Sequence, residues 1–337
     1  MRILIRPRLP VIALLLLAPS IPELLTGSTP ISNVVFNPLG FLVGFPLDII
    51  LYGFGALLIR EYVVAYDKGW ASVLLLGAAY GIAEEGFEVH TFFTPPGHTV
   101  GALGVYGHAF GVNWLWALVL TVFHATYSIA LPILLTNLWF PQVKRARWFD
   151  RGAIGLLAFG YIAEVVVFGF LVGYGPSPAV LAFFIGVVVL LVALAFRAPR
   201  DLLSLRSGPR TIGPNAVVAL GAVEFSAYTV VLFFSSSWLI PAVGATVFYV
   251  LANAAVLFVI LRSIGREDLE RSEFFFAVGM FAPLVAWDVI LEFFVPGILL
   301  VTAFFIYLLY RLNRTLKARA TVARVPVGAA SPPLLGT

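Results

Sequence analysis

The feature that most constrains this chain is the distribution of its basic residues. All 21 Lys and Arg residues fall into six short blocks, at positions 2–8, 60–68, 144–151, 197–210, 262–271 and 311–324. Each pair of neighbouring blocks is separated by enough apolar sequence to cross a bilayer twice, at about 20 residues per crossing. The five intervals therefore predict ten transmembrane helices.

The composition agrees with a membrane protein. Hydrophobic residues make up 61% of the chain and charged residues 11%, whereas a soluble domain has about 25% charged residues. Because basic loops stay on the cytoplasmic side, both termini and all six blocks are expected in the cytoplasm. We therefore predict an all-α fold, a polytopic integral membrane helical bundle in a prokaryotic-type cell membrane. The basic excess is explained by orientation, so no nucleic-acid partner is expected.

The predicted spans leave no room for a soluble domain. They cover about 9–25, 38–59, 70–89, 113–140, 153–173, 179–196, 214–234, 238–261, 274–294 and 297–310. Residues 1–312 are expected to form one transmembrane domain, with the site in 70–141 and further helices in 153–310. Residues 313–337 are expected to form a flexible cytoplasmic tail. The first span is interpreted as retained, because prolines flank the small residues of the only candidate cleavage site.

One span carries an unusual concentration of acid. Glu84 and Glu85 are adjacent in an apolar helix, and Glu88 follows one turn later. A charged side chain near the centre of a bilayer costs about 2.5–3.5 kcal/mol on insertion scales, so intramembrane acids are candidate functional residues. Gly77 and Gly81 in the same span form a small-xxx-small pair that lets another helix approach closely.

All four histidines lie close to this span in the sequence, at positions 90, 98, 108 and 124. Counting from the two ends of their spans, Glu84 and His124 differ in depth by about 7 Å at 1.5 Å per residue. Consecutive spans usually lie side by side. We therefore expect Glu84 or Glu85 to lie near His124, and His108 could fold back toward the same site.

Carboxylates beside an imidazole can deprotonate water, or bind a metal ion or a proton. The candidate metal ligands are Glu84, Glu88, His108 and His124, although the sequence requires no cofactor. The chain has no cysteine, which excludes thiolate nucleophiles and Cys-ligated zinc or iron–sulfur centres. In the alternative interpretation, the two glutamates only bond to neighbouring helices and hold the fold together.

Residues 70–141 resemble the CPBP (CAAX-processing and bacteriocin-processing, or Abi) intramembrane proteases through the Glu84–Glu85 pair. Other signature positions differ: Val89 replaces an arginine, Leu120 stands where the Phe-xxx-His motif has phenylalanine, and Ser128 stands where the His-xxx-Asn motif has asparagine. The resemblance implies a hydrolase that activates water for peptide-bond attack. It implies Glu84 as general base, His124 as its partner, and Glu85 and His108 as supporting residues.

Three functions remain open at this stage. A hydrolase would act on a membrane-borne peptide or small molecule within the lipid bilayer. A proton- or cation-coupled transporter would use the same carboxylates, with Glu164, Glu224 and Asp288 as relay points. A non-catalytic scaffold would need none of these groups for chemistry. The sequence leaves the oligomeric state open.

Overall fold

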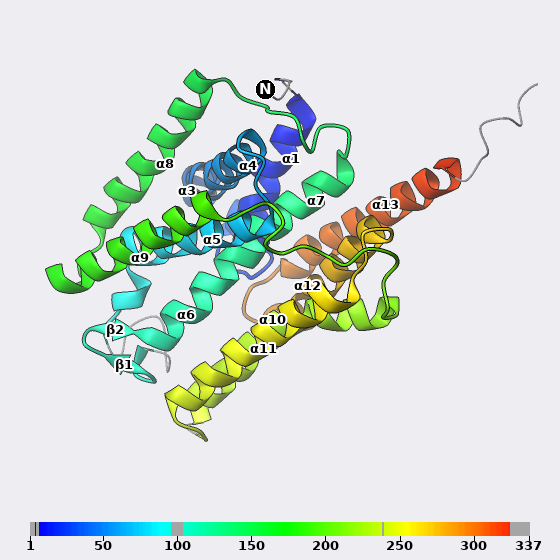
Figure 1. The fold of residues 1–337 in the computed structure, drawn as a ribbon. Coiled ribbons are helices and arrows are strands. Elements are labelled where there is room, and N and C mark those ends of the chain that lie inside the picture. The colour runs from blue at the N-terminus through cyan, green and yellow to red at the C-terminus, as the bar shows by residue number, and fades with distance from the viewer. Residues whose placement is uncertain (1–3, 5–6, 96–103, 238, 324–337) are drawn as a thin grey trace, which may run out of the picture.

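The chain folds into a bundle of helices (Figure 1). The computed structural model describes residues 4, 7–95, 104–237 and 239–323. Within them, eight helical segments are long and apolar enough to cross a membrane. The elements are α1 (Arg8–Pro19), η1 (Ser20–Leu24), α2 (Asn33–Phe36), α3 (Pro38–Asp48), η2 (Ile49–Phe54), α4 (Gly55–Ala65), α5 (Trp70–Ile82), η3 (Ala83–Glu88), η4 (Thr91–Phe93), β1 (His108–Ala109), β2 (Val112–Asn113), α6 (Trp114–Phe123), η6 (His124–Ala130), α7 (Leu131–Trp139), α8 (Arg151–Leu171), α9 (Pro178–Arg197), α10 (Pro214–Ser237), α11 (Ala242–Ser263), α12 (Leu269–Leu291) and α13 (Ile298–Ala323).

The predicted helical membrane fold is confirmed, with one short hairpin (β1–β2) besides the helices, and each predicted span coincides with a helix. Only eight of these helices meet the length and hydropathy requirements for a membrane span. The other two are α1 with η1, a 12-residue helix followed by a five-residue π-helical segment, and α5 with η3, which carries three glutamates. Among the described residues, eight of the ten predicted spans are thus long and apolar enough to cross a membrane.

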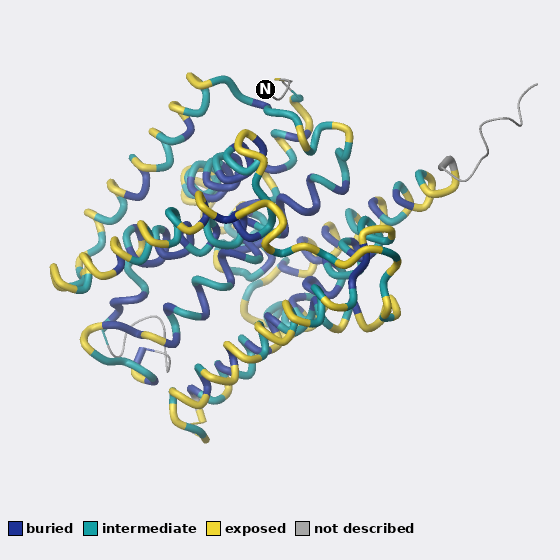
Figure 2. Tube along the Cα trace, viewed as in Figure 1, coloured by how far each residue is buried: buried dark blue, intermediate teal, exposed yellow. Residues whose placement is uncertain are grey.

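The continuous helix α6–η6–α7 lies at the centre of the bundle. In an apolar stretch of 18 residues of this helix, 72% of the residues are buried. In the corresponding stretches of α8, α9 and α11, only 11% of the residues are buried. Figure 2 shows the same contrast between this helix and the outer ones. The central helix is thus enclosed by protein, while α8, α9 and α11 present most of their apolar surface outward, as expected of helices that face lipid.

Two hydrophobic clusters meet on this central helix. Tyr127 and Leu134 belong to a cluster with α10, α12 and α13, while Ile129 and Ile133 belong to one with α1, α4 and α8. The helices form an N-terminal group, α1–α9, and a C-terminal group, α10–α13 (Figure 1). The central helix packs against both groups, with different faces. Any residue near the middle of this helix lies at the junction between the two groups.

The C-terminal end of the bundle differs from the prediction in two ways. Glu292 was assigned to a span, but it lies just beyond α12, where its carboxylate accepts hydrogen bonds from the backbone N–H groups of Gly297 (2.9 Å) and Leu299 (3.0 Å). These bonds, led by that from Gly297, lower the pKa of the Glu292 carboxyl. Glu292 is thus a cap for the start of α13.

The flexible tail was predicted to begin at residue 313, but residues 313–323 are helical. Helix α13 continues to Ala323. Arg319 donates hydrogen bonds to the carbonyl oxygens of Leu138 (2.7 Å) and Trp139 (2.9 Å) at the end of α7. Because carbonyl groups at a helix end have no intrahelical partner, the Arg319 guanidinium satisfies them and holds the extended helix in place. Residues 324–337 lie outside the described part of the chain.

A buried ion pair fastens the loop after α7. Arg60 and Glu61 have exposures of 3% and 1% and form a salt bridge. The Arg60 guanidinium also stacks over Trp148 at 3.5 Å from the ring centroid, and Glu61 accepts a hydrogen bond from the Trp148 backbone N–H at 3.0 Å. Tertiary packing thus encloses a charged pair that stands at the end of a predicted span.

We predict that Arg60→Met lowers the free energy of unfolding by about 3–5 kcal/mol, because it leaves the buried Glu61 carboxylate without its partner. Thermal unfolding of the purified protein in detergent would measure the loss. Arg200→Met is the matched control, since Arg200 forms an exposed pair with Asp67 at 3.0 Å and such pairs contribute about 0–1 kcal/mol. Equal effects of the two substitutions would contradict the prediction.

Candidate functional site

Four π-helical segments in the described part of the chain carry polar side chains that meet in one region. These segments are η1, η2, η3 and η6. A π turn closes its hydrogen bond at i→i+5, is rare, and is frequent at functional sites because it redirects side chains within a helix. The polar residues of these segments that concern the site are Glu23 on η1, Tyr52 on η2, Glu84, Glu85 and Glu88 on η3, and His124 and Ser128 on η6.

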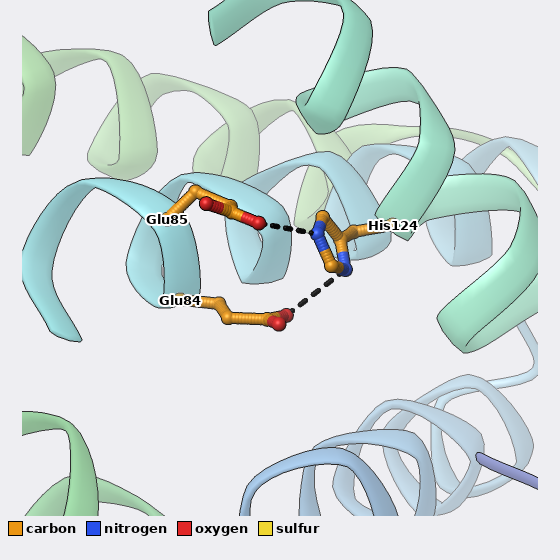
Figure 3. Close-up of side chains that lie close together, drawn as sticks. All are labelled: Glu84, Glu85 and His124. Atoms are coloured by element: carbon orange, nitrogen blue, oxygen red, sulfur yellow. Dashed lines mark hydrogen bonds and ion pairs between the residues drawn. The ribbon is translucent and has the colours of Figure 1, made fainter. Parts of the chain in front are cut away.

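The centre of this region is an imidazole between two carboxylates. Figure 3 shows Glu84 and Glu85 of η3 pointing at the two nitrogens of the His124 ring. Glu84 Oε2 lies 3.0 Å from Nδ1, and Glu85 Oε1 lies 3.0 Å from Nε2. All three residues are buried, with exposures of 3%, 8% and 3%. The expected contact between the glutamate pair and His124 is confirmed.

Further hydrogen bonds orient the three side chains. The Ser128 hydroxyl lies 2.9 Å from His124 Nδ1, one turn along the same helix. The Tyr52 hydroxyl donates to Glu84, and the Thr91 hydroxyl donates to Glu85. The Trp116 indole N–H in turn donates to the Thr91 hydroxyl oxygen at 3.1 Å. Each carboxylate is therefore held by a hydroxyl donor as well as by the imidazole.

Two glycines allow the helices that carry these residues to approach each other. A Cβ atom on Gly77 would lie 2.9 Å from the Ala125 Cα, and one on Gly81 would lie 2.9 Å from the His124 Cβ. The expected close approach at this small-xxx-small pair is thus confirmed, with α6–η6 as the partner. The short helix-to-helix distance lets a glutamate side chain reach the imidazole.

The other predicted site residues lie outside this triad. Glu88 is buried on η3, and its Oε2 has no hydrogen-bond partner among the described residues. His108 lies in the β1–β2 hairpin, where its Nδ1 is 2.6 Å from Asn113 Oδ1. His90 Nδ1 lies 2.7 Å from the Tyr174 carbonyl oxygen. His98 falls outside the described residues.

Three residues from earlier parts of the chain join the site without having been predicted there. Tyr52 contacts both Glu84 and Glu23, and the Thr29 hydroxyl donates to Glu23 at 2.8 Å. Glu23 is an acid near the end of the first predicted span, 9–25. Its pairing was not visible, because helices far apart in sequence supply the two partners.

A metal ion fits the donor set of the triad. One ligand atom each from Glu84, Glu85 and His124 can be chosen so that all lie within 4.8 Å of one another. Two carboxylates and an imidazole suit Zn²⁺, Mn²⁺ or Fe²⁺. Metal-bound histidines usually have their other ring nitrogen fixed by a hydrogen bond, and Ser128 provides that contact at Nδ1. Of the predicted ligands, Glu84 and His124 belong to this group, whereas Glu88 and His108 do not.

Comparison with known proteins places the chain in a family. A family model described as an uncharacterized membrane protein family matches residues 12–329. The chain belongs to this family. Curated proteins and solved structures give no match. The family description names a membrane protein and no activity, so the function of this family member has to be argued from its site.

We predict that Gly81→Ala destabilises the protein by about 1–3 kcal/mol, because the new methyl group would collide with the His124 Cβ. Gly186→Ala is the matched control, since a Cβ atom there meets nothing within 4 Å and alanine is favoured over glycine within a helix by about 0.5–1 kcal/mol. Thermal unfolding of both variants in detergent provides the measurement. A neutral Gly81→Ala would show that α5 and α6 are not in close contact at this point.

Proposed function

We propose that this protein is a membrane-embedded hydrolase in which Glu84, Glu85 and His124 activate water against a membrane-borne peptide or small molecule. The observation that carries the proposal is the carboxylate–imidazole–carboxylate contact, with both distances 3.0 Å and all three side chains buried. Acid–base groups held in contact and shielded from bulk solvent are the requirement for moving a proton to and from a reacting water. The resemblance to CPBP proteases implies the same chemistry.

In this mechanism Glu84 is the general base. It takes a proton from a water molecule as the water oxygen attacks the substrate carbonyl carbon, so that an O–H bond breaks while a C–O bond forms. The His124 ring, held between the two carboxylates, stabilises the negative charge that moves between Glu84 and the developing oxyanion. The proton held by Glu84 then passes to the leaving group as its bond to carbon breaks. Glu85 and Ser128 hold the His124 ring, and Tyr52 holds Glu84.

The surroundings of the triad suit an apolar substrate. A pocket of about 190 Å³ lies between α4, α5, α8 and α9, and its lining includes Leu58, Ala79, Tyr80 and Ala83. Ala83 directly precedes Glu84 in the chain. Tyr80, which lines this pocket, has its ring centroid 6.3 Å from that of His124, so an apolar segment of a substrate in the pocket would lie one side chain away from the triad. If a divalent metal occupies the triad, it would supply Lewis-acid polarisation of the substrate carbonyl.

We predict that Glu84→Gln and His124→Ala each lower hydrolysis by about 10²–10⁴-fold, because each removes a proton-transfer group. Vesicles containing the protein and a mixture of bacterial membrane peptides would be incubated in ¹⁸O-labelled water. Mass spectrometry would then detect the label in newly formed carboxyl groups. Glu224→Gln is the control, because Glu224 is a buried glutamate hydrogen-bonded to Tyr249 rather than to His124.

Equal labelling by the wild type and by both site variants would refute the hydrolase and favour a second candidate, a proton- or cation-coupled transporter. One observation supports this candidate. Glu88 and Glu164 each have a buried carboxylate oxygen with no hydrogen-bond partner among the described residues, and both interact electrostatically with Glu84. The same vesicles loaded with a pH-sensitive dye would report acid uptake after a pH step, and a transporter would lose that uptake with Glu164→Gln.

We further propose ten spans with both termini in the cytoplasm of a prokaryotic-type cell. Because the chain has no cysteine, single introduced cysteines report their side of the membrane without background. We predict that Ser28→Cys reacts with a membrane-impermeant maleimide on intact cells, and that Arg266→Cys reacts only after permeabilisation. Both positions are exposed. The opposite pattern would invert the orientation.

A further inference from the structure

Two basic segments that are far apart in the sequence meet at one end of the bundle. Arg8 is the first residue of α1, and Arg151 is the first residue of α8. Leu4 forms a parallel β-bridge with Arg147 in the loop that leads to α8. Figure 1 shows the starts of both helices at the same edge of the molecule. The first and the third of the basic blocks in the sequence are therefore neighbours in space.

A cavity of about 370 Å³ lies at this junction. Its lining includes Arg8 and Val11 on the side of α1, and Trp148, Asp150 and Ala153 on the side of α8. Sites for small molecules commonly enclose about 300–1,000 Å³. The cavity therefore has room for a ligand, and its lining combines apolar side chains with charged ones.

Basic side chains are in excess around this cavity. Within the described residues, Arg8, Arg147 and Arg151 take part in no ion pair. The Arg147 Nε is buried and has no hydrogen-bond partner there, although buried donors normally have one. The acidic lining residue, Asp150, accepts a hydrogen bond from the Ala153 N–H at 3.0 Å. Its charge thus serves the start of α8, where the helix dipole favours an anion, and the guanidinium groups are left to attract a ligand.

The cavity lies where the outward-facing apolar surfaces of both helices begin. Leu9 and Ile12 of α1 are 69% and 50% exposed, and Leu156 and Phe159 of α8 are 70% and 71% exposed. All four lie within about two helical turns of a lining residue. In a membrane such side chains contact acyl chains, and the polar headgroup region directly flanks the hydrocarbon core. A ligand in the cavity is therefore at the level of the lipid headgroups.

We propose that this cavity binds the headgroup of an anionic phospholipid of the phosphatidylglycerol type. Its phosphate pairs with the guanidinium groups of Arg8 and Arg151, since arginine can donate two parallel hydrogen bonds to a phosphate. Its acyl chains lie along Leu9 and Leu156. Basic pockets between transmembrane helices bind anionic headgroups, and the excess of guanidinium groups here favours an anionic headgroup over a zwitterionic one. The lipid bridges α1 and α8, whatever chemistry the triad performs.

Native mass spectrometry of the delipidated protein in detergent tests the proposal. Separate titrations with dioleoyl-phosphatidylglycerol and dioleoyl-phosphatidylcholine give a dissociation constant for each lipid. We predict that the wild type binds phosphatidylglycerol about tenfold or more tightly than phosphatidylcholine, and that combining Arg8→Gln with Arg151→Gln removes this preference. Ala153→Phe should weaken phosphatidylglycerol binding as well, because it fills the cavity without changing the charge. Unchanged binding by Ala153→Phe would show that the lipid does not enter the cavity.

Arg311→Gln combined with Arg314→Gln is the matched control. Both side chains are exposed on α13, and the change in net charge is the same, so the preference for phosphatidylglycerol should remain. Equal losses in the two double variants would show that only the overall charge attracts the lipid. Equal affinity of the wild type for both lipids would refute the site. Displacement of phosphatidylglycerol by an equal concentration of inorganic phosphate would show a site for the free anion and overturn the lipid as its occupant.

Discussion

The structure depends on one constraint: two adjacent carboxylates in an apolar helix need partners that the helix itself cannot supply. Glu84 and Glu85 find them in the two nitrogens of a single imidazole, at 3.0 Å each. This contact requires α5 and α6 to approach closely, and Gly77 and Gly81 make that approach possible. Removing a charged group from water is costly unless it is paired and hydrogen-bonded, so the packing of these two helices and the chemistry of the site are inseparable.

The position of His124 in the middle of the central helix gives the site its second property. The helix that carries it belongs to both hydrophobic clusters, so the triad lies where the N-terminal and C-terminal groups of helices meet. A relative movement of the two groups would act directly on the imidazole. Both proposed functions can use this position, since a hydrolase needs an enclosed site and a transporter needs one that both halves can reach.

The hydrogen bonds around the triad extend mainly in one direction. From Glu84 they pass through Tyr52 of the second span to Glu23 of the first span, and on to Thr29 in the loop between these spans. Each of these connections joins a carboxylate to a hydroxyl, a group that both donates and accepts hydrogen bonds. On the other side, Glu85 is bonded to Thr91, which accepts from the Trp116 indole. An indole N–H only donates, so that side ends in a group that fixes the geometry of Thr91 and Glu85.

Much of this protein could be predicted from its sequence. The blocks of Lys and Arg and the apolar intervals predict the helical membrane fold, because hydropathy and length decide which segments can lie in lipid. The depth argument predicts the contact between the glutamate pair and His124, since the two lie on consecutive spans. The role of Gly77 and Gly81 was visible for the same reason, as a spacing within one helix.

Tertiary structure alone decided the rest. Tyr52 and Glu23 join the site because α1, η2 and η3 pack together, and nothing in the local sequence of one helix records which face of a distant helix it meets. The burial of Arg60 and Glu61 follows from the path of the loop that reaches Trp148. The extension of α13 to Ala323 follows from the hydrogen bonds of Arg319 to the end of α7. Local sequence determines which segments are helices in the membrane, whereas contacts between segments distant in sequence determine which polar groups meet there.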